Sequence, residues 1–245
     1  MLFQTLIATI FGSVLSLLGG VVLLWREAFA RKFSLTLVSF AIGSLLGAAF
    51  FELVPEALQE IPFARVGPLM ILGILTFFLF EKVLEWYHCH DQEVCDYHAF
   101  SSTVLFGDAL HNFVDGVAIA LSFSVSVAAG IATAVAVFLH EIPQEMGDFG
   151  VLLHAGYERS KVLFYNFLTA LTAIAGALLG YFLLPWIHDF VGIFLAYIAG
   201  SFIYIAVSDL LPELKHKTRG GDVGHILAIL MGVVVIWWLG ILISE

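Results

Sequence analysis

The chain has 245 residues, of which 61% are hydrophobic and 12% are charged, against roughly 25% charged residues in soluble domains. A soluble globule of this length could not bury so much apolar surface, and the same composition argues against a disordered chain or a coiled coil. The formal net charge of −10 argues against a nucleic-acid partner, which would need a basic face. We therefore predict an all-α polytopic membrane protein whose main solvent is lipid.

Eight stretches of the chain are apolar enough, over about 20 residues or more, to cross a bilayer as helices. They cover residues 2–25, 34–56, 66–87, 101–123, 127–154, 161–185, 189–211 and 223–243. Helices are favoured over a β-barrel because runs this long lack the alternating pattern of barrel strands. The connections are short, so the sequence predicts a single eight-helix membrane domain over residues 1–245, with a polar loop at 88–100.

The distribution of basic residues predicts how these helices are oriented. If the N-terminus lies outside, the outer loops hold only Arg65. The inner loops then hold Arg26, Arg31, Lys32, Lys82, Arg159, Lys161, Lys215, Lys217 and Arg219. Because inner loops are enriched in Lys and Arg, we expect both termini to lie outside. The first span lacks the features of a cleaved signal peptide, and the short loops lead us to expect a bacterial inner membrane.

The second and seventh spans share an internal repeat. Gly43-Ser44 precedes Glu52-Leu53-Val54-Pro55-Glu56, and Gly200-Ser201 precedes Asp209-Leu210-Leu211-Pro212-Glu213 at the same spacing. The second span runs outward and the seventh inward, which predicts an inverted repeat of helices 1–3 and 6–8 around helices 4 and 5. Such repeats are typical of alternating-access transporters. The alternative is two convergent helix ends, since proline often follows a helix stop.

Polar residues form a stripe on each of the two central spans. The fourth span carries Asp108, His111, Asn112 and Asp115, and the fifth carries His140, Glu141, Gln144, Glu145 and Asp148. Their spacing places each set on one helical face, and ionisable groups inside a membrane mark a functional site. Neither stripe contains Lys or Arg, so a bound divalent cation would balance the carboxylates. Imidazole mixed with carboxylate and amide oxygen favours a transition metal over calcium or magnesium.

Three other interpretations of the stripes deserve comparison. They could form an interhelical hydrogen-bond network, or a proton relay that coexists with a metal path. The segment His140-Glu141-Ile142-Pro143-Gln144 also resembles the start of the HExxH helix of zinc proteases. Gln144 occupies the position of the second histidine, however, so we expect no enzymatic activity. An intramembrane metal-dependent hydrolase or protease remains the alternative to a metal transporter.

Two motifs together resemble a known family of transporters. The segments His111–Gly116 (HNFVDG) and His140–Glu145 (HEIPQE) resemble the paired signatures of the ZIP (Zrt/Irt-like protein) metal transporters. Gly147-Asp148-Phe149 and the segment Phe51–Glu56 are similar to the same family, so the resemblance covers essentially the whole chain. It implies uptake of divalent metal into the cytosol, chiefly Zn²⁺, with Fe²⁺, Mn²⁺ or Cd²⁺ in some members. It also implies a homodimer in the lipid bilayer.

The resemblance further implies a binuclear metal centre between the fourth and fifth helices. Its ligands, carried over by motif position, would be His111, Asn112, Asp115, His140, Glu141 and Gln144. An elevator motion of helices 1, 4, 5 and 6 against helices 2, 3, 7 and 8 is implied as well. The chain departs from the family where Gln144 replaces the histidine or glutamate of many members. Residues 162–184 also lack the carboxylate of some prokaryotic members and offer Asn166, Thr169 and Thr172, so a second metal site would be weak or absent.

Two peripheral parts of the sequence also carry metal-binding or acidic side chains. The 88–100 loop contains potential metal ligands, namely His88, Cys89, His90, Cys95 and His98, which predict weak metal binding. The alternative is a short polar loop with incidental histidines. The repeat also places Glu52 and Glu56 near the outer face and Asp209 and Glu213 near the inner one. Acidic groups at each mouth would raise the local cation concentration. The alternative is that these carboxylates cap helices or bind lipid headgroups.

Overall fold

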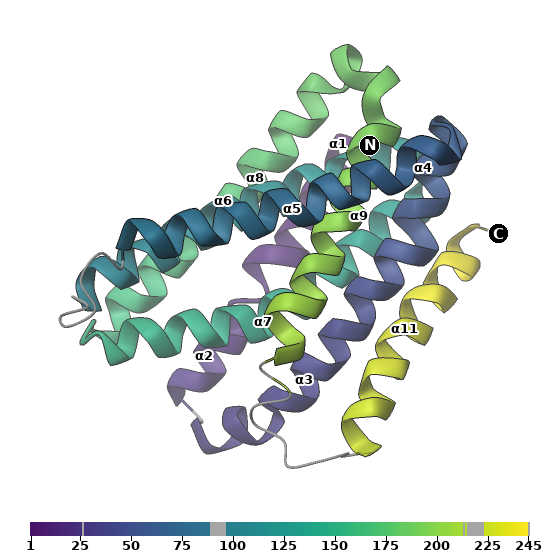
Figure 1. Ribbon diagram of the computed structural model, residues 1–245. Coiled ribbons are helices and arrows are strands. Elements are labelled where there is room, and N and C mark those ends of the chain that lie inside the picture. The colour runs from purple at the N-terminus through teal and green to yellow at the C-terminus, as the bar shows by residue number, and fades with distance from the viewer. Residues whose placement is uncertain (26, 89–96, 213, 215–222, 245) are drawn as a thin grey trace.

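The computed structural model describes the chain apart from residues 26, 89–96, 213, 215–222 and 245 (Figure 1). The described residues form helices and contain no strand. The α-helices are α1 (Leu2–Thr9), α2 (Leu18–Trp25), α3 (Glu27–Gly47), α4 (Val54–Glu60), α5 (Phe63–His88), α6 (Tyr97–Val125), α7 (Val127–His154), α8 (Arg159–Ile187), α9 (Val191–Tyr204) and α11 (Val223–Ser244). The π-helical turns η1 (Ile10–Val14), η2 (Ala48–Leu53) and η4 (Ile205–Leu210) and the 3-10 turn η3 (His188–Phe190) link some of them.

Seven stretches of the described chain are long and apolar enough to cross a membrane. They are Leu2–Trp25, Leu35–Glu60, Phe63–Phe80, Val127–Gly150, Arg159–Ile187, Val191–Ser208 and Val223–Leu242. Helix α6 is 29 residues long, which exceeds the length of a bilayer span, but its two aspartates and two histidines lower its hydropathy. The predicted class, an all-α polytopic membrane protein, is confirmed, and α6 lies where the sequence predicted the remaining span.

The helices around the polar loop extend further than the apolar runs predict. Helix α5 continues to His88 and α6 already begins at Tyr97, whereas the sequence predicted a loop over 88–100. Hydropathy marks where a helix leaves lipid, and nothing in residues 97–100 breaks a helix at that point. The loop residues 89–96, with both cysteines, lie outside the described residues.

The two copies of the repeat share an unusual backbone feature. The π-helical turn η2 begins five residues after Gly43, and η4 begins five residues after Gly200. Each turn ends two residues before a proline, Pro55 or Pro212. Proline cannot donate a backbone hydrogen bond and its ring crowds the carbonyl four residues earlier, and a wider turn relieves this crowding.

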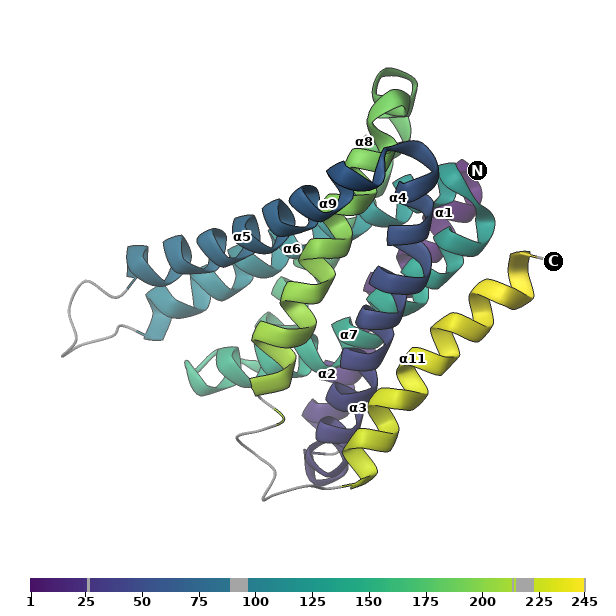
Figure 2. The same cartoon turned by 45° about the vertical axis from the view of Figure 1, so that its right-hand side comes forward.

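Packing against the neighbouring helices follows the same repeat. Helix α3 packs on α11, and α5 packs on α9. In each pair, both helices contribute a glycine that lies against a backbone carbonyl of the other helix. These contacts join Gly43 to Ile229, Gly232 to Phe40, Gly73 to Tyr197 and Gly200 to Met70. A Cβ atom at any of the four glycines would collide with backbone, so only glycine permits this approach. Helices α3 and α9 run in opposite directions (Figure 1, Figure 2), which confirms the predicted inverted repeat.

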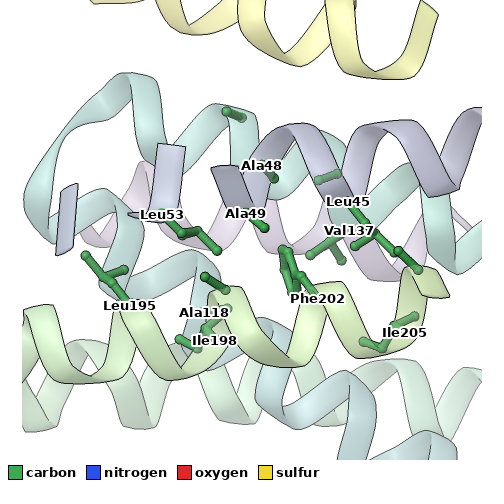
Figure 3. Packing of buried hydrophobic residues seen from close by; sticks show 14 of the residues in the cluster. Leu45, Ala48, Ala49, Leu53, Ala118, Val137, Leu195, Ile198, Phe202 and Ile205 are labelled. Carbon is green, nitrogen blue, oxygen red and sulfur yellow. The ribbon is translucent and has the colours of Figure 1, made fainter. Parts of the chain in front are cut away.

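The apolar core lies between the two copies of the repeat (Figure 3). Leu45 and Leu53 come from the second span, and Phe202 and Ile205 come from the seventh. Val137 of α7 belongs to the same buried cluster, which ties the core to one of the two polar helices. Close packing, rather than exclusion of water, stabilises such a core in lipid. The repeat therefore forms a rigid frame beside α7.

Helices α6 and α7 are held inside the bundle by small residues. On α6, Gly116 meets the carbonyl of Ala173 on α8, and Gly176 of α8 meets the carbonyl of Phe113. Gly20 lies against the ring of Phe149 on α7, so the first span packs closely on the fifth. These contacts fix the positions from which the polar side chains of α6 and α7 project.

Candidate metal centre

Four of the predicted ligands converge at one point between α6 and α7. The Nε2 atoms of His111 and His140 lie 3.0 Å apart, and Asp115 Oδ2 lies 3.4 Å and 3.2 Å from them. Glu141 Oε1 completes the group at 3.6 Å from His111 Nε2 and 3.8 Å from His140 Nε2. The two pairs of side chains are brought together because His111 and Asp115 are one turn apart on α6, while His140 and Glu141 are neighbours on α7.

The backbone of α7 determines which nitrogen of His140 faces the group. His140 Nδ1 lies 3.0 Å from the carbonyl oxygen of Ala136, one turn earlier on the same helix. A carbonyl can only accept a hydrogen bond, so the neutral ring carries its proton on Nδ1 and presents the lone pair of Nε2. Metal-binding histidines are oriented in this way by a partner on the other ring nitrogen.

The spacing of the four atoms matches that of a single tetrahedral ion. Ligands at 2.0–2.1 Å from Zn²⁺ in a tetrahedron are about 3.3 Å from one another, and the five separations above fall on both sides of that value. Asp115 Oδ2 and both carboxylate oxygens of Glu141 are buried without a hydrogen bond within the described chain. Buried carboxylates without partners are costly, and a cation among them would remove that cost.

Aromatic rings from the repeat helices enclose the centre. The ring of Phe77 on α5 meets that of His111 edge-on, with centroids 6.4 Å apart. Phe202 of α9 meets His140 in the same manner at 6.0 Å. Of the four converging side chains only His111 retains some exposure, at 11% of its surface, so the centre is almost closed to its surroundings.

Asn112 is buried, and its amide is hydrogen-bonded to groups outside the four converging side chains. Its amide nitrogen donates to Asp108 Oδ1 at 2.9 Å, and its carbonyl oxygen accepts from the hydroxyl of Ser13 in the first span. Both ends of the amide are therefore engaged, and Asn112 links α6 to η1. Nothing in the local sequence pointed to Ser13, which reaches the site only through the tertiary packing.

Gln144 of α7 and the polar residues of α8 contact α6 or their own helix. The side chains of Gln144 and Thr169 lie beside the carboxylate of Asp108, within reach of a hydrogen bond. Asn166 donates to the backbone of its own helix, at 2.8 Å from Val162 O, and its side-chain oxygen has no partner within the described chain. Thr172 donates to the carbonyl of Ala109, so it connects α8 with α6.

A second group of acidic side chains lies next to the first. Asp108, Glu141 and Glu145 each place a carboxylate oxygen within 4.8 Å of the others, and all three are buried. The sequence placed Asp108 and Glu145 on the polar stripes but not among the expected ligands. Their spacing was the available signal, because Asp108 is three residues before His111 and Glu145 is four residues after Glu141.

The expected acidic mouths are described only in part. Glu52 is buried, and Glu56 accepts a hydrogen bond of 3.1 Å from Ser126. Both line a cavity of about 580 Å³ together with Trp237. Residues 89–96 and 213 lie outside what the structure describes, as do the side chains of His88, His98 and Asp209. Their expected roles stay predictions.

A helical membrane protein with metal-ligand side chains deep in its bundle belongs, by fold and site, among proteins that move ions across membranes. The family model described as "ZIP Zinc transporter" matches residues 85–240 of this chain. The match covers more than half of the chain and includes all six predicted ligands. The chain therefore belongs to the ZIP family.

Individual relatives agree with this assignment. The zinc transporter ZIP10 of Danio rerio is 42% identical over 141 residues, which is 55% of this chain and 17% of the relative. The zinc transporter foi of Drosophila melanogaster is 40% identical over 132 residues, or 53% of this chain and 19% of the relative. The metal cation symporter ZIP14 of Xenopus tropicalis is 28% identical over 290 residues, covering 86% of this chain and 61% of the relative.

The lengths and names of these relatives limit what they imply. The chain spans less than a fifth of the first two relatives, which are much longer proteins. All three are named as transporters or symporters, and the family model is that of a transporter. The hydrolase alternative finds no support in them, which agrees with the expectation that the chain is not an enzyme.

Proposed function

We propose that this chain carries Zn²⁺ across a membrane through the centre formed by His111, Asp115, His140 and Glu141. The observation that supports this most strongly is the convergence of two imidazole nitrogens and two carboxylate oxygens at tetrahedral spacing. The family assignment and the zinc transporters among the relatives point to the same cargo. Fe²⁺, Mn²⁺ and Cd²⁺ are alternative cargoes, which the name of the metal cation symporter relative leaves open.

The proposed ligand set suits a transported ion better than a permanently bound one. Two neutral imidazoles and two carboxylates together neutralise a divalent cation, and they replace the water that the ion loses on entry. No thiolate belongs to the group, so binding stays weak enough for release. Asn112 and Gln144 remain proposed ligands of a further ion position, although both now face Asp108.

The arrangement of the ligands supports a moving-element mechanism. All four converging side chains belong to α6 and α7, whereas α5 and α9 of the repeat contribute only the rings of Phe77 and Phe202. We propose that the first, fourth, fifth and sixth membrane spans, which include α6 and α7, move together. They would slide against a frame made of the second, third, seventh and eighth spans, which include α5 and α9. At the centre the moving helices would pass only two aromatic edges, so the ion could travel with its ligands. The hydrogen bond of Ser126 to Glu56 joins the two sets of helices and would have to break during the motion.

Orientation, membrane and assembly are further parts of the proposal. The basic residues favour both termini outside, with metal moving toward the cytosol. The short loops favour a bacterial inner membrane, although the relatives described above come from animals. We also propose a homodimer, as the family resemblance implies. The molecular mass of the purified protein, measured by light scattering with the detergent subtracted, tests the dimer directly.

Transport itself is tested with purified protein in liposomes. Zn²⁺ uptake is followed with a trapped fluorescent zinc indicator while Cd²⁺, Mn²⁺ or Mg²⁺ is added outside in excess. We expect Cd²⁺ to compete strongly and Mg²⁺ weakly, because two imidazoles disfavour a hard cation. Uptake no faster than in empty liposomes, or competition by Mg²⁺ equal to that by Cd²⁺, would overturn the proposal.

A further inference from the structure

The cavity beside the second span lies apart from the histidine centre and has the size of a small-molecule site. It is lined by residues of η2 and α4, by the start of α7 and by the end of α11. Its volume of about 580 Å³ falls within the range of roughly 300–1,000 Å³ that is usual for ligand pockets. Its lining includes two carboxylates, those of Glu52 and Glu56, and two aromatic rings, those of Phe51 and Trp237.

Glu52 is the side chain in this cavity that most needs a partner. It is only 7% exposed, although it lines the cavity. In the part of the chain that the structure describes, its carboxylate meets the like charge of Glu56 and accepts no hydrogen bond. Glu56, in contrast, accepts hydrogen bonds from Ser126 and Gln59. A buried carboxylate without a donor is costly, so Glu52 favours a cationic ligand in the cavity.

The backbone on both sides of Glu52 is shaped around its carboxylate. Glu52 belongs to the π-helical turn η2, and such turns are frequent at functional sites. On the facing helix α11, Gly240 lies against Glu52 Oε1, and a Cβ atom at this glycine would collide with that oxygen. The glycine therefore leaves the room that the carboxylate occupies at the wall of the cavity.

The lining of the cavity favours an organic cation over a metal ion. Among the residues that the structure describes, the side chains that could together hold a metal form two groups, and neither includes Glu52 or Glu56. A metal ion that gives up its water needs more ligands than two carboxylates offer. An organic ammonium group instead matches the carboxylates by charge, and it is attracted to the ring of a residue such as Trp237.

We propose that this cavity binds an organic ammonium group, with Glu52 and Glu56 as its counter-charges and Trp237 as its aromatic wall. Lipid headgroups and soluble amines both carry such a group. The occupant would touch α4 and α11 of the frame and also the start of α7, so it would hold the moving helices against the frame and slow transport. This effect on transport rests on the proposed function, whereas binding of the ammonium group does not.

Binding is tested by calorimetry on the purified full chain, with choline as the probe, in a maltoside detergent that carries no ammonium group. We expect saturable binding of choline that Glu52→Gln weakens at least about tenfold, because a buried charge loses its partner. Trp237→Leu changes a half-exposed residue and should weaken binding about threefold to tenfold.

The matched control is Glu60→Gln, which removes a charge from the same helix but does not line this cavity. It should leave choline binding within about threefold. No saturable binding of choline by the wild-type protein would overturn the proposal. So would a loss in Glu60→Gln equal to that in Glu52→Gln, or a heat of binding for K⁺ equal to that for choline, because either would show only a general attraction of cations to an acidic surface.

Zn²⁺ uptake into liposomes tests the effect on transport and the source of the ammonium group. Each rate is divided by that of the same variant in phosphatidylglycerol vesicles without choline. Slower uptake after addition of phosphatidylethanolamine to the vesicles would identify a lipid headgroup, and slower uptake only with choline would identify a soluble amine. Either result supports the proposal if Glu52→Gln abolishes the slowing.

Two outcomes of the uptake measurement count against the proposal. No slowing in either arm, or slowing that Glu52→Gln leaves unchanged, would overturn the effect on transport. Choline bound normally by a protein that transports no Zn²⁺ would refute the proposed function alone.

Discussion

At the scale of single residues, the centre depends on groups that are oriented before an ion arrives. The hydrogen bond of His140 Nδ1 to Ala136 fixes both the tautomer and the direction of Nε2. The edges of Phe77 and Phe202 restrict both rings. An ion that enters this centre therefore replaces its water with ligands that need little rearrangement, which keeps the cost of binding low.

The first prediction concerns the converging ligands. Replacing His140 or Asp115 with Ala should reduce Zn²⁺ uptake in liposomes to that of empty vesicles, because each change removes one of four ligands. The loss of activity should exceed the factor of about 10–100 that is usual when the replaced residue only hydrogen-bonds to a metal ligand. The control is Ser201→Ala, whose hydroxyl donates only to Ile198 of its own helix. Near wild-type uptake by either ligand variant in a folded protein would refute the proposed centre.

The second prediction concerns Asn112, whose amide lies between Ser13 and Asp108. Asn112→Ala removes a donor from the buried carboxylate of Asp108, which costs about 1–3 kcal/mol, while the hydroxyl of Ser13 keeps the carbonyl of Ala170 as an acceptor. We expect a lower unfolding temperature, while the affinity of the histidine centre for Zn²⁺ changes far less than in His140→Ala. Titration of Zn²⁺ against both variants, together with thermal unfolding in detergent, measures the two effects separately. An equal loss of Zn²⁺ affinity in both variants would make Asn112 a ligand of that centre.

The sequence predicts the roles of some of these residues but not of others. Helical periodicity places His111 with Asp115 and His140 with Glu141, and charge balance explains why the two stripes face each other. Helical periodicity does not determine which partners the side-chain amide of Asn112 contacts. The direction of Asn112 depends on Ser13, which lies 99 residues away. Likewise, a short sequence motif does not show which carboxylates bind the same ion. The distances in the structure are needed to distinguish the four converging ligands from a nearby carboxylate such as that of Asp108.

At the scale of elements, small residues determine how closely the helices approach. The pairs α3 with α11 and α5 with α9 are equivalent in the repeat, and both use a glycine against a backbone carbonyl. The sequence showed the repeated segment itself. It did not reveal the π-helical turns η2 and η4, because the same prolines are also compatible with simple helix ends.

The third prediction tests this packing. At Gly43 a Cβ atom would collide with the carbonyl of Ile229, while at Gly150 nothing lies within 4 Å. Gly43→Ala should therefore destabilise the protein by about 1–3 kcal/mol, and Gly150→Ala should be neutral or slightly stabilising, since alanine favours helices. Denaturant unfolding in detergent measures both. The repeat predicts that Gly200→Ala resembles Gly43→Ala, and a neutral result at both positions would contradict the proposed packing.

At the scale of the whole molecule, the inverted repeat forms a frame around the helices that carry the ligands. The N-terminus, the end of α4 and the end of α11 lie toward one end of the bundle, and the end of α9 and the start of α11 lie toward the other (Figure 1, Figure 2). Hydropathy and the basic residues predicted this arrangement of spans.

The fourth prediction tests the orientation. The two native cysteines, Cys89 and Cys95, belong to a loop that the basic residues place in the cytosol. A membrane-impermeant maleimide added to intact cells should leave both unlabelled. Gln59→Cys at the exposed end of α4, in a Cys89→Ser/Cys95→Ser background, should be labelled rapidly. The reverse pattern, with permeabilised cells as the control for reactivity, would invert the proposed topology and the direction of transport.

The most direct test of the central claim is the environment of Zn²⁺ bound to the purified protein in a one-to-one ratio, measured by X-ray absorption at the zinc edge. His111, Asp115, His140 and Glu141 predict four nitrogen and oxygen neighbours at about 2.0–2.1 Å, with the outer-shell scattering of two imidazole rings. His140→Ala should remove one of the two rings from the spectrum. Six oxygen neighbours without imidazole scattering in the wild-type protein would show that zinc does not bind at the histidine centre, and the account would be wrong.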